Sequence, residues 1–561
     1  MKKGRLERQI LLTFGNVYQD TIDLHLSLKE LPKNASLEFI TYLLHLLNVR
    51  KRSDKMFQSN HLIQWMMMME GDSQKRLLEF VIENGSIVFD PGFKLLDRRP
   101  CLDLIQHLLV HADPEKKGEL QKHGYNNLFR LLLYFNARAI EYEKNIFKWD
   151  GTGTFQQFAD EILKLQTRNL ENERPKNYVI QFLKVYYFFK FCESDTEYSF
   201  YLKQFLEELS INSYKSYLWM LLSPYLKLQV NDEPTPKIHI DGDDQFLFFY
   251  KRLAINGNIE VDVDYKSLRA YPLYELGDNM FLFLDFRFFV DKFYNGFLFD
   301  FSARTGLPFP KLKKTMGIDF SEPILFYSIM SNCFEGYGEI NLTGTGLKKM
   351  LKDSEPDYYI RRDRDIFLFE FKDILISSEI KYADSLDEIK AGLLNKLERD
   401  VKGKRKGISQ LLNSIKEISC GKYVEKGVDN LSPNGVTIFP ILVHTDVSLE
   451  AYGTNYFLAQ RMKELISMED ISNLEIKNLT LIHLDTLLLL QDHFKSHRLE
   501  LGDCLRAYIL YVCSGDPVND TIPFDEFVKY YFVENNNTLI GKPSIFKEII
   551  MDFEKRQIEG N

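Results

Sequence analysis

The chain has 561 residues, of which 45% are hydrophobic and 27% are charged, the composition of an ordinary globular protein. This composition excludes a chain that is disordered throughout, and the low content of 30 Gly and 18 Pro excludes a collagen-like or linker-dominated chain. The length predicts about three or four domains. The formal net charge of −9 means that any site for nucleic acid must be a local basic patch.

The sequence carries no sign of export or membrane insertion. No stretch reaches the roughly 18 uncharged apolar residues that a membrane helix needs, and the N-terminal residues lack the apolar core of a secretory signal. The 6 cysteines contain no CxxC pair, which argues against a disulfide framework or a zinc cluster. We therefore expect a reduced, cytoplasmic protein with no membrane contact.

Residues 1–230 show the periodicity of helices. Phe155, Phe158 and Ile162 recur at helical spacing, and Leu128–Ile146 is a long apolar-striped stretch without Pro or Gly. We expect this half of the chain to be mostly α-helical, and from its size we interpret it as the part that senses specificity or a partner.

A change of character follows at 231–237, where NDEPTPK is the strongest linker signal in the chain. Short β-prone runs then alternate with turns, which predicts a small strand-containing module over 231–310. Its expected strands are 238–240, 245–250, 259–263 and 280–284. Residues 311–450 alternate helices and strands, typical of an α/β domain, and 451–561 are expected to be mostly helical, with a last helix over 544–554.

The most informative stretch is the β-prone run that begins at Ile366. It is apolar on both faces, as in a covered central strand, yet Glu370 and Lys372 interrupt it on one face. A charged side chain is costly to bury without a partner, so these two residues need a reason to be there.

Hairpin pairing supplies such a reason. If residues 358–361 pair antiparallel with the run from Ile366, Asp357 lies across from Glu370, with Cβ atoms only about 4.5–5.5 Å apart. Two carboxylates that close repel each other unless a proton or a cation lies between them. Mg²⁺, a hard cation that proteins hold with one or two carboxylates, suits this arrangement.

These residues resemble the signature of the PD-(D/E)xK nuclease superfamily, with Pro356-Asp357 followed by Glu370-Phe371-Lys372. The resemblance implies an α/β restriction-endonuclease-like core with the element order αβββαβ, within a larger multidomain chain. The expected core elements are a helix at 324–334, strands at 337–342, 357–361 and 366–373, a helix at 407–419 and a strand at 436–445.

The resemblance also implies the role of each residue. Asp357, Glu370 and the backbone carbonyl of Phe371 would bind Mg²⁺, with Mn²⁺ as a substitute, and Lys372 would serve the attacking water. Some members of the superfamily add a carboxylate on the first helix and a polar residue on the second helix. The nearest matches for these accessory positions are Glu322 and Gln410.

A basic segment, KLERDVKGKRK at 396–406, precedes the expected second helix and has six basic and two acidic residues. Such a segment can contact the phosphate backbone of nucleic acid without reading its sequence. The candidate contacts are Lys402, Lys404, Arg405 and Lys406. The alternative interpretation is a solvated surface loop.

We therefore expect a Mg²⁺-dependent nuclease that hydrolyses DNA, more specifically an endodeoxyribonuclease, and an effector of bacterial defence against phage or of restriction. Three alternatives stay open at this stage. The same core could cleave RNA, the chain could be a non-cleaving nucleic-acid-binding or scaffold subunit, or Glu370 and Lys372 could be a structural pair on an edge strand. A homodimer or a partner protein subunit is compatible with each of these.

Overall fold

Two units make up the chain, in the computed structural model whose described residues are 10–49, 56–149, 152–173, 176–230, 236–241, 244–352, 355–536 and 541–559. The helical unit consists of Leu6–Asn145 and Glu173–Phe309, and the sheet unit contains Ile146–Asn172 and Pro310–Asn561. The predicted linker at 231–237 lies mostly outside the described residues, and the division into four parts at 230, 310 and 450 stays a prediction.

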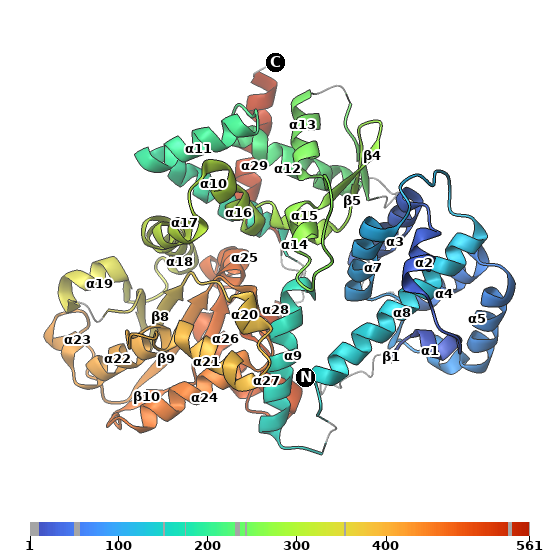
Figure 1. Ribbon diagram of the computed structural model, residues 1–561. Helices are drawn as coiled ribbons and strands as arrows, with labels where there is room; N and C mark the ends of the chain where they lie inside the picture. Colours follow the sequence, from blue (N-terminus) through green and yellow to red (C-terminus); the bar gives the residue numbers. More distant parts are fainter. Residues whose placement is uncertain are drawn as a thin grey trace. The chain divides into compact units, whose positions relative to one another are not determined.

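Helices dominate the helical unit (Figure 1). They are α1 (Phe14–Val17), α2 (Leu24–Lys29), α3 (Lys33–Val49), α4 (Phe57–Met68), α5 (Gly71–Glu83), α6 (Gly85–Val88), α7 (Arg98–His111), α8 (Lys122–Ile146), α10 (Tyr178–Ser194), α11 (Thr196–Glu208), α12 (Tyr214–Val230), α13 (Asp244–Leu253), α14 (Lys266–Ala270), α15 (Phe286–Asp291) and α16 (Asn295–Thr305). Two short strands, β1 (Ile10–Leu11) and β2 (Phe93–Lys94), pair in parallel. The predicted helical character of residues 1–230 is thus confirmed for the described part of the chain.

A buried ion pair joins the two segments of the helical unit. Arg98 in α7 donates two hydrogen bonds to Asp285, at 3.1 and 2.8 Å, and both side chains are almost wholly inaccessible to solvent. A charge in this position is tolerable because the guanidinium and the carboxylate meet in the bidentate geometry that suits both.

The predicted strand-containing module is only partly correct. Its sheet has the antiparallel order β3 (Lys237–His239), β5 (Met280–Phe283), β4 (Leu273–Gly277). The prediction of a strand at 245–250 is wrong, because Phe249, Tyr250 and Leu253 recur at helical spacing and are buried on one face of α13. Residues 259–263 lie in a loop, and β4 was not predicted.

The sheet unit is built on a mixed sheet of six strands in the order β10-β9-β8-β7-β6, with β11 also paired to β9. The strands are β6 (Ile340–Thr343), β7 (Tyr358–Arg362), β8 (Asp365–Lys372), β9 (Val436–His444), β10 (Leu474–Ile476) and β11 (Thr480–His483). The pairs β6–β7 and β7–β8 are antiparallel, whereas β8, β10 and β11 run parallel to β9.

The sheet is covered by helices on both faces (Figure 1), and helices make up most of the rest of this unit. In chain order they are α9 (Phe155–Glu173), α17 (Phe309–Met316), the π-helix η1 (Gly317–Phe326), α18 (Tyr327–Phe334), α19 (Gly344–Leu351), α20 (Ser378–Lys381), α21 (Leu386–Leu397), α22 (Gly407–Ser419), α23 (Lys422–Glu425), the 3₁₀ helix η2 (Val447–Glu450), α24 (Thr454–Ser467), α25 (Leu484–Lys495), α26 (Leu501–Tyr511), α27 (Pro517–Thr521), α28 (Phe524–Asn536) and α29 (Ser544–Glu559). Among the described residues, no helix has the length and apolar character that crossing a bilayer requires.

The two faces of β8 bury different side chains because successive residues of a strand point in opposite directions. Ile366 and Leu368 join a core with buried residues of α21, α22 and α24. On the other face, Phe371 stacks on Phe326 of η1 at 4.7 Å between ring centroids, while Phe369 lies near Phe334 of α18. The chain is therefore mixed α/β in this unit, with a sheet covered by helices on both sides.

The elements expected between 324 and 445 occur close to their predicted positions. The predicted hairpin register is confirmed, because Tyr358 pairs with Phe369 and Ile360 with Phe367. The expected helix at 407–419 coincides with α22, and the expected last strand with β9. Four helices were not predicted: α19 is inserted between β6 and β7, α20 and α21 lie between β8 and α22, and α23 lies between α22 and β9.

The C-terminal region differs from the expectation at one place. Residues 451–561 are mostly helical, and the last helix begins at Ser544 as predicted, but β10 and β11 extend the sheet. Each is short, and its hydrogen-bond partners lie about 40 residues earlier in β9, as in the register pair Thr480 and Ile441. Such strands carry little local signal because their stability comes from non-local pairing.

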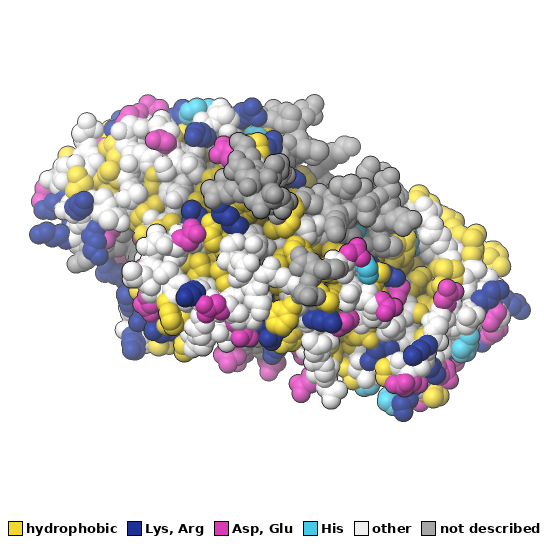
Figure 2. Space-filling view, turned by 90° about the horizontal axis from the view of Figure 1, so that it is seen from above, with side chains coloured by type: hydrophobic (Ala, Val, Ile, Leu, Met, Phe, Trp, Pro, Cys, Tyr) yellow, Lys and Arg dark blue, Asp and Glu magenta, His cyan; other side chains and the backbone are white. Residues whose placement is uncertain are grey.

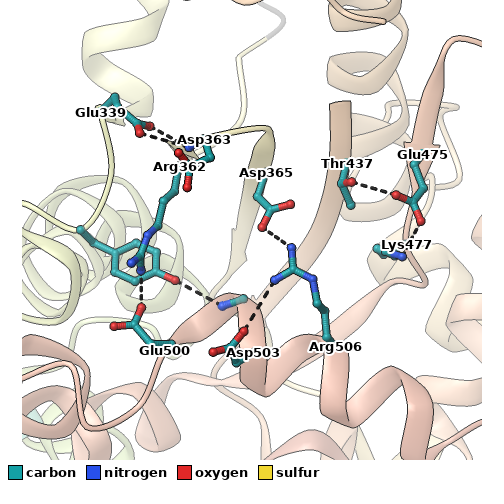
Figure 3. Close-up of polar contacts among 12 residues, drawn as sticks. Glu339, Arg362, Asp363, Asp365, Thr437, Glu475, Lys477, Glu500, Asp503 and Arg506 are labelled. Atoms are coloured by element: carbon teal, nitrogen blue, oxygen red, sulfur yellow. Dashed lines mark hydrogen bonds and ion pairs between the residues drawn. The ribbon is translucent and has the colours of Figure 1, made fainter. Parts of the chain in front are cut away.

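Ion pairs attach α26 to the hairpin end of the sheet (Figure 3). Arg506 pairs with Asp365 at the start of β8, and Arg362 at the end of β7 pairs with Glu500. The backbone N–H of Gly502 donates to the Tyr337 hydroxyl at 3.3 Å. These contacts lie at the opposite end of the β7–β8 hairpin from Asp357 and Glu370.

The core between the sheet and α22 makes a direct stability prediction. Leu411 is fully buried, so Leu411→Ala removes apolar contacts and leaves a cavity, at a cost of about 2–5 kcal/mol in the free energy of unfolding. Leu510, 75% exposed on α26, is the matched control, and Leu510→Ala should change the free energy by less than about 0.5 kcal/mol. Denaturant unfolding measures both, and equal effects of the two substitutions would contradict this placement of the core.

Candidate functional site

Asp357 and the end of β8 come together at one end of the hairpin. Asp357 immediately precedes β7, and continuation of the β7–β8 register places it opposite Glu370. The Asp357 Oδ2 accepts a hydrogen bond from the backbone N–H of Phe371 at 2.6 Å. This bond fixes the carboxylate of Asp357 against the backbone between Glu370 and Lys372.

Lys372 bridges the two carboxylates. Its Nζ donates to Glu370 Oε1 at 2.5 Å and to the Phe371 carbonyl at 3.0 Å, and lies 3.8 Å from Asp357 Oδ2. The nuclease resemblance assigns the oxygens of Asp357, Glu370 and Phe371 to a divalent cation. In this structure the ammonium group of Lys372 neutralises the charge that such a cation would meet.

Burial makes this group electrostatically unusual. Glu370 is completely buried, whereas the side chains of Asp357 and Lys372 are 18% and 17% exposed. Burial, with the neighbouring Asp357 charge added, raises the pKa of Glu370 to about 8. Burial likewise raises the pKa of Asp357 to about 6, although Lys372 opposes the shift. Burial acts to lower the pKa of Lys372, but the two carboxylates outweigh it and raise that pKa.

Glu322 lies on the π-helix η1 and faces the same group of charges. Its Oε1 accepts a hydrogen bond from the Tyr327 hydroxyl at 2.7 Å. The Glu322 charge contributes to the raised pKa values of Asp357 and Glu370, which places its carboxylate near theirs. The structure thus brings this predicted accessory residue to the site.

Gln410 lies half-buried on the first turn of α22. The start of this helix is close to β9, because a Cβ built on Gly407 would lie 2.9 Å from the side chain of Leu442. Leu442 is the register partner of Glu370 on the neighbouring strand. The first turn of α22 therefore lies over the strand next to Glu370, and the structure describes no contact between the Gln410 side chain and the acidic group.

The basic segment forms a turn directly before α22. Asp400 Oδ1 accepts hydrogen bonds from the backbone N–H groups of Lys402 and Lys404, both at 3.0 Å. The side chains of Lys402, Lys404 and Arg405 are exposed, and Lys406 is partly buried. Arg405 also donates to Asn413 of α22 at 2.6 Å. Acidic and basic side chains are interspersed over the face of the molecule that Figure 2 presents.

The oxygen atoms near Asp357 and Glu370 can be compared with the ligands that a divalent cation needs. Among the described residues there is no cluster of three or more His, Cys, Asp or Glu side chains arranged to hold a metal ion. The candidate ligands are the carboxylates of Asp357 and Glu370 and the backbone carbonyl of Phe371. Of their oxygens, Glu370 Oε2 is buried without a hydrogen-bond partner. A buried oxygen of this kind is a costly acceptor, and hard oxygen donors suit Mg²⁺. The residues therefore fit a hard cation once the Lys372 ammonium group has moved away from them.

Sequence reasoning missed two residues near the group. Tyr327 gave no signal, because an aromatic residue in an apolar helix is read as core. His444 ends β9 as the register partner of Lys372, is buried, and contacts the Asp446 carbonyl through Nδ1 at 3.0 Å. A polar residue at the C-terminal end of an apolar strand was the available signal for it, because sites in such sheets lie at that edge.

Comparisons of the chain with protein-family models, with curated proteins and with solved structures found no match.

The raised pKa of Glu370 predicts a pH dependence of stability. Because burial raises the pKa of Glu370 from its ordinary value of 4.5 to about 8, the contribution of this carboxyl group to stability is full below pH 4.5 and is lost as the pH rises toward 8. Glu370→Gln removes this titration and leaves that of Asp357, so the variant should lose less stability than the wild type between pH 5 and pH 8.5.

Thermal unfolding in EDTA between pH 5 and 8.5 measures this difference. Glu425→Gln, at an exposed side chain of α23, is the control and should follow the wild type. An unchanged slope for Glu370→Gln would show that the Glu370 carboxylate is already ionised and well solvated in the folded protein.

Proposed function

We propose that the protein is a Mg²⁺-dependent phosphodiesterase that cleaves DNA, with a restriction-endonuclease-like core in the sheet unit. The observation that carries the proposal is the buried group of Asp357, Glu370 and Lys372, with the Phe371 carbonyl between the last two. Support also comes from the order of elements from η1 to β9, which follows the order that the PD-(D/E)xK resemblance implies once α19, α20, α21 and α23 are set aside.

The residues of this chain divide the chemistry between them. Asp357, Glu370 and the Phe371 carbonyl would hold Mg²⁺, which when bound supplies a water of lowered pKa and stabilises charge on the scissile phosphate. Lys372, freed from Glu370, can donate a hydrogen bond to the attacking water or to a phosphate oxygen. Because its amine keeps its proton, it also offsets the negative charge that develops during the displacement.

The basic turn before α22 supplies the contact with the nucleic-acid backbone. Lys402, Lys404 and Arg405 are exposed, and the start of α22 lies over the strand next to Glu370. Phosphates bound by these cations would run toward the acidic group, which without them repels a polyanion. By the resemblance, cleavage leaves a 5′-phosphate, and we place such an enzyme among cytoplasmic effectors of restriction or anti-phage defence.

One observation favours a second candidate function. Lys372 already forms a direct ion pair with Oε1 of Glu370, which is how a retained but inactive core would balance the charge of a buried carboxylate. In that case the sheet unit is a non-cleaving subunit that binds nucleic acid or a protein partner. The two functions differ in metal dependence, because only the enzyme needs a cation at Asp357 and Glu370.

Cleavage assays test the first function directly. Supercoiled plasmid, linear duplex, single-stranded DNA and RNA are incubated with Mg²⁺, Mn²⁺ or EDTA, and we expect metal-dependent cleavage with DNA preferred. Lys372→Ala should lower the rate by about 10²-fold or more, because it removes a charged donor from the transition state. Lys416→Ala, which removes an exposed lysine of α22, is the matched control and should cleave like the wild type.

Binding of Mg²⁺ is measured alongside by the melting temperature. Mg²⁺ should raise this temperature for the wild type and not for Asp357→Asn. Absence of cleavage together with absence of a metal effect would reject the enzyme in favour of the binding subunit. Preferred cleavage of RNA would replace DNA by RNA as the substrate and leave the site unchanged.

Neutralising the basic turn should weaken binding of nucleic acid without altering the acidic group. Replacement of Lys402, Lys404 and Arg405 by Gln should reduce affinity for duplex DNA and lower the dependence of log affinity on log salt by about two to three units. Fluorescence anisotropy at several salt concentrations measures both. The control replaces three exposed lysines of the helical unit, Lys116, Lys117 and Lys122, and an equal loss in that variant would locate the contact elsewhere.

A further inference from the structure

The π-helix η1 places two residues in contact that an α-helix would separate. Glu322 and Tyr327 are five positions apart, which in an α-helix is about 1.4 turns and leaves their side chains on different sides of the helix. In η1 the backbone N–H of Tyr327 donates to the carbonyl of Glu322, the i to i+5 pattern of a π-helix. The Tyr327 hydroxyl then donates to the Glu322 carboxylate at 2.7 Å.

The same hydroxyl lies against the segment that carries Asp357. A Cβ built on Gly344, the first residue of α19, would lie 3.1 Å from the Tyr327 hydroxyl and 3.1 Å from the Cα of Asp357. The N–H of Gly344 also donates to the Asp357 carbonyl at 2.7 Å. Tyr327 is thus in the immediate neighbourhood of Asp357, and a side chain at position 344 would intrude between them.

Thr345 completes the surroundings of the hydroxyl. Its side chain acts to lower the pKa of the Tyr327 hydroxyl, which burial and the nearby Glu322 raise, so it lies beside that hydroxyl. The Tyr327 hydroxyl is thus held by its bond to Glu322 and by close packing against the first turn of α19. The Glu322 carboxylate is therefore held in one place by a side chain that is itself held by α19.

We propose that Tyr327 is a positioning residue, which holds the Glu322 carboxylate toward the Asp357–Glu370 pair so that its negative charge adds to the attraction of that pair for the cation. The inference rests on the proposed function and goes beyond it, because it assigns a purpose to the π-helical turn and to the inserted helix α19. Glu322 alone, on a regular α-helix, would have no partner at Tyr327 to hold it toward the pair. Side chains that orient a metal ligand typically change metal affinity by about 10- to 100-fold when removed.

A double-mutant cycle separates positioning from simple stability. Tyr327→Phe keeps the ring and removes only the hydroxyl, whereas Glu322→Gln keeps the size and removes the charge. We expect Tyr327→Phe to weaken Mg²⁺ binding about 10-fold and Glu322→Gln at least as much, as measured by isothermal titration calorimetry. The double variant should bind no more weakly than Glu322→Gln, because Tyr327 acts only through Glu322.

Tyr337→Phe is the matched control. It removes a tyrosine hydroxyl that accepts a hydrogen bond at the other end of the same sheet, and it should leave Mg²⁺ affinity unchanged. Melting temperatures without metal report whether each variant is folded. Thr345→Val gives a second test that leaves both Tyr327 and Glu322 intact, and it should weaken binding in the same direction and by less.

The outcomes distinguish this inference from the function on which it rests. If the wild type binds no Mg²⁺, or if Asp357→Asn binds it equally well, the proposed function and the inference fail together. If Asp357→Asn abolishes binding while Tyr327→Phe and Glu322→Gln leave it unchanged, the inference alone is wrong. Fully additive losses in the double variant would also overturn it, because Tyr327 would then act independently of Glu322.

Discussion

Neutralisation of a carboxylate buried in the middle of a sheet is the constraint on which the sheet unit depends. Glu370 has no access to water, and its strand is covered by helices on both faces, so any negative charge on it must be balanced within a few ångströms. Lys372 supplies that balance, and Asp357 is held beside it by the N–H of Phe371. The hairpin register, set by residue pairs far from this end, decides whether these three groups meet.

This constraint explains why the surroundings of the group are unlike the rest of the sheet. The first turn of α22 requires glycine at 407, because a larger residue would meet Leu442 next to the buried Glu370. On the opposite side, η1 departs from α-helical geometry and α19 begins with a second close-packed glycine at 344. Helix irregularities and glycine contacts of this kind reduce local stability, and here they gather around one cluster of charges.

Much of this end of the fold could be predicted from the sequence, because alternation along β8 and a polar turn determine the hairpin. The position of Asp357 beside Glu370 followed from that register alone. The wrong predictions have equally specific causes. The aromatic run in α13 is compatible with a strand as well as a helix, and the unpredicted strands β10 and β11 depend on distant partners in β9. The contact between Glu322 and Tyr327 had no signal, because it exists only when the helix between them is a π-helix.

The helix α9 shows that the two units are interleaved along the chain. It belongs to the sheet unit, where Lys164 and Arg168 donate to the carbonyls of Asp384 and Ala383, yet the residues before and after it belong to the helical unit. A cut at residue 230 would thus remove a piece of the sheet unit along with the helical half. The helical unit is therefore not a single segment joined to one end of the sheet unit, because the chain passes from the helical unit into the sheet unit at Ile146 and returns to the helical unit at Glu173.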